Sequence, residues 1–351
     1  MEFYFLLTAT LVLAVLTFLP VLRFEAWWIR LWDFPRLQLA VFIVVLLIVQ
    51  LTRLDLSEPV SWGLVVIAVA CLANQAWWIL PYSPFFRKEV VNAKGKRGEA
   101  LAVMTANVLT PNRNAPALVT LVRQHRPDIL VTLESDQWWE DQLRELESDY
   151  PHTIKCPLDN LYGMHVYSRL PLQDAETRFM VEDDVPSMHA KAVLASGRQV
   201  RVHFLHPAPP SPTENDESTE RDAELVLVAR EVADESGPII VTGDLNDVAW
   251  SETTRLFRKI SGLLDPRVGR GMFNSFHAEH WLIRWPLDHV FHSHHFTFGS
   301  MRRLPAFGSD HFAILTTLVL EPSSQDEEDG LSADKDDREL ADEKLAQANT
   351  D

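Results

Sequence analysis

The stretch PIIVTGDLND, residues 238–247, decides how the chain is interpreted. An apolar run that ends at a glycine predicts a buried strand followed by a turn. Asp244 and Asn246 lie two residues apart, and residues at this spacing on a strand share one side. They can therefore address one ligand, such as a hydrated phosphate or a divalent cation. Because Asp and Asn are also ordinary turn formers, these residues alone leave a plain turn equally open.

Charge is unevenly distributed along the 351 residues, whose formal net charge is −17. The net charge is +3 over residues 1–98, −12 over 99–321 and −8 over 322–351. An acidic body argues against tight binding to long nucleic acid, because such binding depends largely on phosphate neutralisation. The two cysteines, Cys71 and Cys156, are far apart and form no metal motif.

Three apolar runs near the N-terminus predict a membrane anchor over residues 1–81: residues 3–22, 37–51 and 59–81. Each is long enough to cross a bilayer or nearly so, and tryptophans lie near their ends, as interfacial aromatics do. A buried helical core is the alternative, as is a cleaved signal peptide for the first run. The first run lacks a basic segment before it, which argues against a signal peptide.

The basic residues around these runs predict which side of the membrane holds the rest of the chain. Three spans place the first loop and the C-terminal region together, and that side carries most of the basic residues, whereas Arg53 lies on the other. The positive-inside rule then predicts a cytoplasmic domain, in the inner membrane if the source is bacterial. The prediction reverses if one run does not span.

A polar linker, residues 82–98, leads to a domain over residues 99–321 in which strand and helix patterns alternate. The pattern predicts an α/β domain with some antiparallel strand pairs. Predicted strands are 101–109, 129–134, 162–168, 188–195, 199–205, 238–242, 287–292 and 311–320, and predicted helices are 115–125, 136–148, 223–234 and 252–260. The acidic tail, residues 322–351, lacks aromatic residues and is predicted to be disordered.

Polar residues recur where the predicted strands end or begin, and strand ends in α/β sheets are where ligand sites assemble. Turn formation or helix capping is the alternative for each of them. These residues are Asn107, Glu134, His206, Asp244, Asn246, Asp288, Asp310 and His311.

Seven segments in this order resemble the endonuclease/exonuclease/phosphatase family. They are MTANV (104–108), LVTLES (130–135), YGMHVYSRLPL (162–172), VHFLHPAPP (202–210), VTGDLND (241–247), PLDHVF (286–291) and GSDHFAI (308–314). The resemblance covers about residues 99–320. It implies a four-layer α/β sandwich, with two facing mixed sheets flanked by helices. It also implies hydrolysis of phosphoesters with Mg²⁺ or Mn²⁺.

The resemblance assigns roles position by position. It implies metal binding by Glu134, with Asn107 beside it helping to hold the metal or its waters, and Asp310 as a ligand to a second metal in some members. It implies that Asp244 positions or activates the attacking water and that Asn246 contacts the phosphate. It implies that His206 contacts the phosphate or assists the leaving group. His311 resembles the histidine of the SDH motif, and Asp288 the aspartate that orients it. Mg²⁺ prefers oxygen ligands and keeps several waters, so one or two carboxylates suffice.

The leading hypothesis is a membrane-anchored metal-dependent phosphodiesterase or phosphatase that acts by water attack. Its partners are the lipid bilayer and a phosphoester, which can be a small molecule, a lipid head group or nucleic acid; no protein partner is evident. A catalytically inactive binding module on the same anchor is the alternative, and within the enzyme class a nuclease is another. The histidines at 292, 294 and 295 suggest either a transition-metal site or, with no acidic or cysteine partner, a solvated loop.

Overall fold

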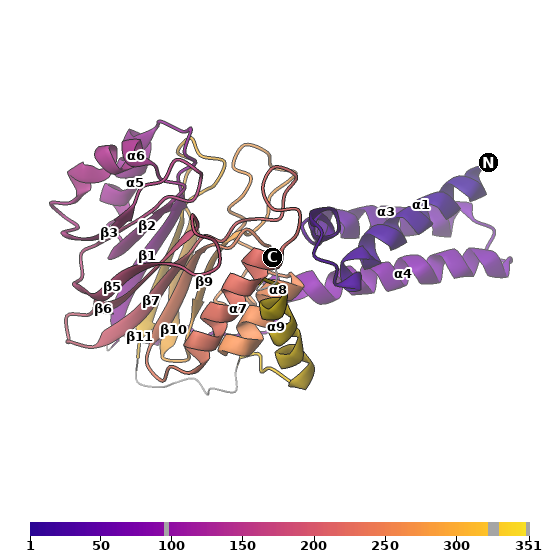
Figure 1. Ribbon diagram of the computed structural model, residues 1–351. Coiled ribbons are helices and arrows are strands. Elements are labelled where there is room, and N and C mark those ends of the chain that lie inside the picture. Colours follow the sequence, from indigo (N-terminus) through magenta and orange to yellow (C-terminus); the bar gives the residue numbers. More distant parts are fainter. Residues whose placement is uncertain (95–97, 322–329, 349–351) are drawn as a thin grey trace.

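The computed structural model describes residues 1–94, 98–321 and 330–348. Three N-terminal helices project from one side of the α/β body (Figure 1): α1 (Glu2–Phe18), α3 (Arg36–Arg53) and α4 (Pro59–Ile79). They coincide with the three predicted apolar runs, and each is long and apolar enough to cross a membrane. Short helical segments join them to one another or to the body: η1 (Leu19–Leu22), α2 (Trp27–Arg30), η2 (Leu31–Asp33) and η3 (Leu80–Tyr82).

Polar side chains join the three helices to one another inside the bundle. Gln50 donates to Thr10 Oγ1 (2.8 Å). Gln75 donates to Thr17 Oγ1 (3.1 Å) and accepts from Arg36 (3.3 Å). Side-chain hydrogen bonds of this kind hold helices together where lipid removes the hydrophobic driving force.

Two mixed sheets face each other in the body. The six-stranded sheet has the order β10-β11-β1-β2-β4-β3, and the five-stranded sheet has the order β5-β6-β7-β8-β9. The pairs β1–β2 and β7–β8 are parallel and the others are antiparallel. The strands are β1 (Glu99–Asn107), β2 (Ile129–Leu133), β3 (His152–Cys156), β4 (Met164–Ser168), β5 (Leu172–Phe179), β6 (Pro186–Val193), β7 (Gln199–Leu205), β8 (Ile239–Asp244), β9 (Asp288–His292), β10 (Phe296–Arg303) and β11 (Ile314–Leu320).

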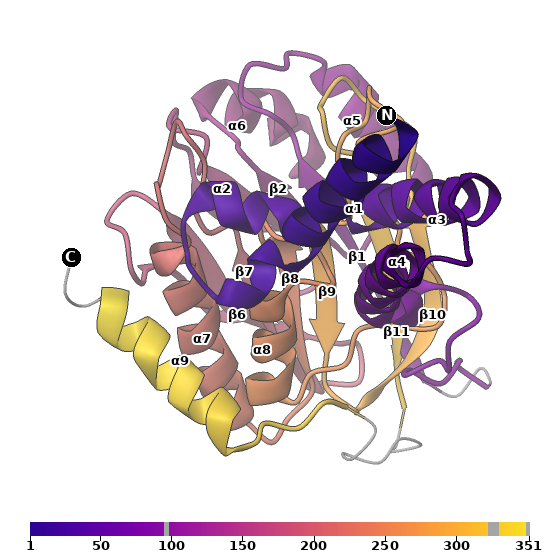
Figure 2. The same cartoon turned by 90° about the vertical axis from the view of Figure 1, so that its right-hand side faces the viewer.

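Helices cover the outer face of each sheet, which completes the predicted four-layer sandwich (Figures 1 and 2). The six-stranded sheet packs against α5 (Ala115–His125), α6 (Gln137–Leu143) and η4 (Arg144–Leu146). The five-stranded sheet packs against α7 (Thr219–Ala233) and α8 (Glu252–Ser261). Between the sheets, alternate residues of both, such as Val103, Val131, Val202 and Ile240, form one buried core.

The strands that the sequence pattern failed to predict are all edge strands. β3 and β10 end the six-stranded sheet, and β5 ends the five-stranded one. Seven of the eight residues of β5 are polar, exposed or both, and the eighth, Leu172, is half-buried. An edge strand with little buried surface carries no clear alternation of apolar and polar residues, so periodicity cannot reveal it.

The prediction that the tail is disordered is wrong for residues 335–348. These residues form helix α9 (Lys335–Ala348) alongside α7 and α8 (Figure 2). Ala341 is buried against Val226 and Leu256. Lys344, only 4% exposed, donates to Asp222 (2.6 Å) and Glu25 (2.9 Å). These contacts stabilise a helix whose own sequence is too polar to predict one. Of the rest of the predicted tail, residues 322–329 and 349–351 lie outside the described residues.

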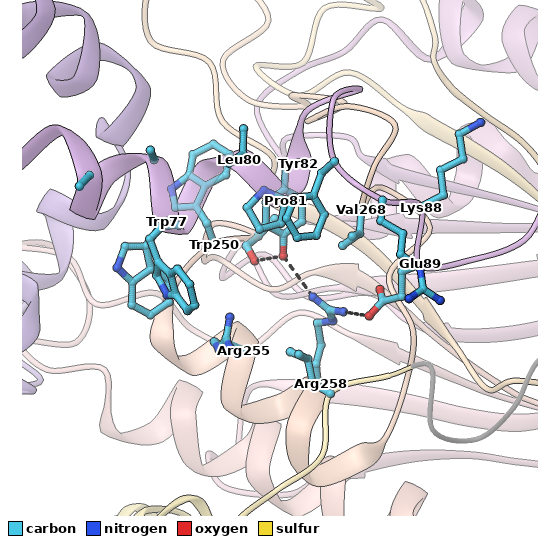
Figure 3. A pocket seen from close by; sticks show the side chains of 17 residues that line it. Trp77, Leu80, Pro81, Tyr82, Lys88, Glu89, Trp250, Arg255, Arg258 and Val268 are labelled. Carbon is cyan, nitrogen blue, oxygen red and sulfur yellow. Dashed lines mark hydrogen bonds and ion pairs between the residues drawn. The ribbon is translucent and has the colours of Figure 1, made fainter.

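The helical bundle and the body pack directly on each other. Trp250 Nε1 donates to the carbonyl of Asp33 (2.8 Å), and the Tyr82 hydroxyl donates to the carbonyl of Ala249. A cavity of about 710 Å³ lies at this junction, between the end of α4 and the start of α8 (Figure 3). Part of the predicted linker also packs on the body, because Glu89 forms a buried ion pair with Arg258. The junction is therefore an ordered interface.

A buried histidine pair in the five-stranded sheet predicts a stability that depends on pH. His189 Nδ1 lies 2.7 Å from His203 Nδ1, and burial lowers their pKa values to about 4 and about 3. Below pH 6.5 the unfolded chain takes up protons that the folded chain does not. Stability should therefore fall as the pH drops from 6.5 towards 4, by up to about 1.4 kcal/mol per pH unit for each histidine.

Urea unfolding of the full-length chain at pH 7 and pH 5 measures this dependence. The double variant His189→Leu/His203→Leu should lose less stability between these pH values than the parent chain. Equal losses in the two proteins would contradict the assignment.

Candidate active site

Four strand ends and one turn bring the predicted polar residues together at one edge of the two sheets. Asn107 ends β1, Glu134 follows β2, and Asp244 at the end of β8 pairs with Asp288 at the start of β9. His311 lies in the turn that precedes β11. A hydrogen bond between the hydroxyls of Thr105 and Thr242 (2.8 Å) joins the two sheets just beneath this edge.

Asn107 connects the two sheets within the site. Its amide nitrogen donates to Glu134 Oε1 (2.6 Å) and to Asp244 Oδ2 (3.1 Å). Its oxygen accepts from the backbone N–H of Leu109 (3.0 Å). With both polar atoms engaged, Asn107 positions the two carboxylates in this structure rather than presenting a free oxygen.

His311 lies between two buried carboxylates. Its Nδ1 is 2.8 Å from Asp288 Oδ2, and its Nε2 is 3.4 Å from Asp244 Oδ2. Burial alone would lower its pKa, but the two carboxylates outweigh burial and raise the pKa to about 10. The imidazole is therefore protonated on both nitrogens at neutral pH. Burial opposes ionisation of Asp244, but His311, His206 and the hydrogen bonds from Asn246 and Asn107 together lower the pKa of that carboxyl.

A buried oxygen of Glu134 shows whether a cation fits this site. Its Oε2 is buried and, among the described residues, has no hydrogen-bond partner. Burial raises the pKa of this carboxyl, and the half-buried Asp310 nearby adds to the effect. An unpartnered buried carboxylate oxygen is costly unless a proton or a cation compensates it. The donors here are oxygens, which suit Mg²⁺ or Mn²⁺.

A second grouping with metal-ligand chemistry is Asp244, Asp288 and His311, whose ligand atoms lie within 4.8 Å of one another. The doubly protonated imidazolium of His311 already places a positive charge there. A metal ion bound between these groups would have to displace a proton from His311. Glu134, whose buried Oε2 has no partner among the described residues, is therefore the better centre for a cation site.

The turn after Asp244 departs from the strand spacing that the sequence suggests. β8 ends at Asp244, and Asn246 has a left-handed backbone with φ of 51°. The Asn246 N–H donates to Asp244 Oδ1 (3.0 Å), and its side chain donates to the carbonyl of Pro207 (3.0 Å). The segment is thus a turn as well as part of the site. The hydrogen bond from Asn246 to Pro207 holds the loop that carries His206.

His206 and Asp310 also lie next to this group. His206 Nδ1 is 3.2 Å from the carbonyl of Asp244, and its ring lies 5.6 Å from that of Tyr162. Asp310 Oδ1 accepts from Ser309 Oγ (3.3 Å). Both His206 and Asp310 act electrostatically on the Glu134 carboxyl, which places them around one centre.

The other histidines near these motifs have structural roles. His289 Nδ1 accepts from Arg267 (2.7 Å), its Nε2 contacts the carbonyl of Asp247 (2.9 Å), and burial lowers its pKa to about 3. Within residues 1–94, 98–321 and 330–348, the histidines at 292, 294 and 295 form no group of metal ligands. The predicted solvated loop is wrong for His292, which ends β9 and is fully buried, whereas His294 and His295 are half-buried.

Two supporting residues were missed by sequence reasoning. Arg221, buried at the start of α7, donates to the carbonyl of Asn246 (3.0 Å) and lies 3.4 Å from Asp247 Oδ2. Phe276 places its ring 5.0 Å from that of His311. Arg221 lies in a run of acidic residues and Phe276 in a segment without regular periodicity, so neither carries a local signal.

Comparisons with known proteins identify the family of this chain. The sequence profile described as Endonuclease/Exonuclease/phosphatase family matches residues 104–311, more than half of the chain. No curated protein sequence matches the chain.

Among solved structures, TDP2 from D. rerio with a single-strand DNA product has 15% identity and a TM-score of 0.54, covering 63% of this chain and 99% of that one. The human Nocturnin catalytic domain with bound sulfate has 16% identity and a TM-score of 0.52, covering 62% and 94%. A family protein from Bacteroides thetaiotaomicron has 18% identity and a TM-score of 0.51, covering 65% and 97%. These likenesses show the fold, and with the profile match they establish that the chain belongs to the endonuclease/exonuclease/phosphatase family.

Proposed function

We propose that this chain is a membrane-anchored, Mg²⁺- or Mn²⁺-dependent phosphoesterase. Its family generally hydrolyses phosphoester bonds. The observation that carries the proposal is the convergence of Glu134, Asp244 and the His311–Asp288 pair around Asn107 at one sheet edge. Three helices long enough to cross a membrane support the anchor.

The metal ion would be held by Glu134, with Asp310 beside it. When bound, it would neutralise charge on the phosphate and orient the reactants. Asp244, kept ionised by His311, would position the attacking water and accept its proton as the P–O ester bond breaks.

His311 would donate hydrogen bonds to the phosphate oxygens as negative charge develops on them, with Asp288 holding its Nδ1–H. His206, which lies next to Asp244, would also contact the phosphate. Asn246 would act by fixing the loop that carries His206.

Metal binding gives a direct test that does not depend on substrate. Mg²⁺ at about 100 times its dissociation constant should stabilise the full-length chain in detergent by about 2.7 kcal/mol, since it binds the folded state. Glu134→Gln should abolish the rise in melting temperature. The matched control is Glu224→Gln, because Glu224 is also buried and burial raises its pKa to about 8, but it lies on α7.

Activity is tested on the same proteins with bis(p-nitrophenyl) phosphate, with Mg²⁺, with Mn²⁺ and with a chelator. Hydrolysis that requires a divalent ion is expected. A metal-linked rise in melting temperature without hydrolysis of any phosphoester would favour the inactive binding module. The absence of both a metal-linked rise in melting temperature and phosphoester hydrolysis would overturn the assignment of the site.

A nuclease is the second candidate, because the similar D. rerio protein was solved with a single-strand DNA product. The net charge of −12 on residues 99–321 opposes tight binding of long nucleic acid. Single-stranded DNA and plasmid in the same assay distinguish a nuclease from a phosphoesterase that acts on other substrates.

We also propose that the domain faces the cytoplasm. Arg23 and Arg30 lie beside Glu252 of the body, and Arg36 is the first residue of α3, whereas Arg53 is its last. Protease added to right-side-out membrane vesicles should then leave the domain intact, and digestion without permeabilisation would contradict this orientation.

A further inference from the structure

A hairpin-like loop is built directly on the candidate active site. Phe276 donates through its backbone N–H to Trp285 (3.0 Å), and Ala278 donates to the carbonyl of Asp310 (2.6 Å). Phe276 also forms an isolated bridge with His311. The residues between the two arms, 277–284, are called the tip loop below. Because its arms bond to the backbone of the Ser-Asp-His turn, the position of the tip loop is fixed relative to the site.

The end of the tip loop exposes three consecutive apolar side chains. Trp281 is 74% exposed, Leu282 61% and Ile283 43%. A contiguous exposed apolar group marks a surface that meets protein or membrane. The loop is otherwise well held, since Arg284 donates to the carbonyls of His277 (2.9 Å) and Ala278 (2.6 Å).

The tip loop contacts the beginning of a candidate membrane span. Gln38, in the first turn of α3, donates to the carbonyl of Leu282 (2.7 Å). The ring of Phe34, two residues before α3, packs edge-on against Trp285 at 5.5 Å. The exposed apolar residues therefore lie beside the end of the bundle at which α3 begins.

Side chains at the same end of the bundle indicate where the lipid head groups would lie. Arg36 lies over the ring of Trp78 at 5.0 Å, at the domain end of α4. In the junction cavity, Trp77 lies on the α4 side, and Arg255 and Lys88 lie on the side of the body (Figure 3). Tryptophan next to an apolar span, with cations just beyond it, is the arrangement found at membrane–water interfaces.

Ring contacts connect the candidate active site to the end of the bundle where the lipid head groups would lie. Three successive ring contacts lead from His311 to Phe276 (5.0 Å), from Phe276 to Trp285 (6.2 Å) and from Trp285 to Phe34 (5.5 Å). The head-group region of a bilayer is itself several ångströms thick on each side. These ring contacts therefore connect His311 directly to the segment at which α3 begins, where the head-group region would lie.

We infer that the tip loop inserts into the surface of the membrane that holds the anchor, and that the substrate is a phospholipid of that membrane. This inference rests on the proposed phosphoesterase function. Water attacks the lipid phosphorus, one P–O ester bond breaks, and the leaving oxygen takes up a proton to become an alcohol. The apolar tip excludes water from the approach and places the lipid phosphate beside Glu134 and His311.

The test compares one soluble and one membrane substrate with the full-length chain in phospholipid vesicles. The tip variant Trp281→Ser/Leu282→Ser/Ile283→Ser should lower lipid hydrolysis at least about tenfold, while hydrolysis of bis(p-nitrophenyl) phosphate changes less than about twofold. The matched control is Phe179→Ser, because Phe179 is 47% exposed but lies on the edge strand β5. It should change neither rate.

Insertion is measured separately with brominated lipids. They should quench the tryptophan fluorescence of the parent chain more than that of Trp281→Phe, and equal quenching would overturn insertion. Hydrolysis of the soluble ester or of single-stranded DNA, with no lipid hydrolysed, would overturn the lipid substrate and leave the phosphoesterase proposal standing. Hydrolysis of neither soluble ester nor lipid would overturn the proposed function itself.

Discussion

Asp244→Asn and His311→Ala are each expected to lower kcat for bis(p-nitrophenyl) phosphate by about 10²–10⁴-fold. Asp244 is the buried carboxylate proposed to accept the proton of water, and an amide cannot do so. His311 carries a positive charge at neutral pH because Asp244 and Asp288 raise its pKa to about 10. Its removal takes away a donor to the developing oxyanion and leaves two buried carboxylates without their shared cation.

Melting temperatures distinguish loss of chemistry from loss of folding in these variants. His165→Ala is the control, because His165 is fully buried on β4 and burial lowers its pKa to about 3, so it serves packing. It should lower the melting temperature but retain most of the activity. Full activity in either Asp244→Asn or His311→Ala would refute the proposed mechanism.

Lys344→Met is expected to destabilise the folded chain by about 3 kcal/mol, the range in which breaking a buried ion pair falls. Lys344 is 4% exposed, and the variant would remove a cation from Asp222, which is fully buried, and from Glu25. Asp222 keeps its contact with Arg221 (2.8 Å), so part of its charge remains compensated.

Urea unfolding of the full-length chain measures this effect, with Lys335→Met as the matched control. Lys335 pairs with Glu339 at 3.0 Å, but its side chain is 87% exposed. An exposed pair contributes little, so the control should change stability by less than about 1 kcal/mol. Equal unfolding midpoints for Lys344→Met and the parent chain would show that α9 does not depend on this contact.

The sequence predicted most of what lies inside the fold. Central strands such as β2 and β8 are continuous apolar runs, and their ends carry Glu134 and Asp244, so the site could be predicted from its motifs. Edge strand β5 could not be predicted, because its polar residues resemble those of a loop.

Features that depend on contacts between distant segments also escaped prediction. Helix α9 is stabilised by Lys344, whose partners are far away in the sequence. The orientation of Asn246 follows from its bond to Pro207, not from strand spacing. The exposed apolar residues Trp281–Ile283 resemble a short buried strand until their surroundings are known.

The contact between Glu25 and Lys344 has a consequence for how the protein is made. The two residues are separated by 319 positions in the chain, so the contact can form only after all the residues between them have been synthesised. Domains generally fold in order during synthesis, N-terminal parts first. Here the segment between α1 and α3 can complete its contacts with the body only after α9 has been synthesised and has docked beside it.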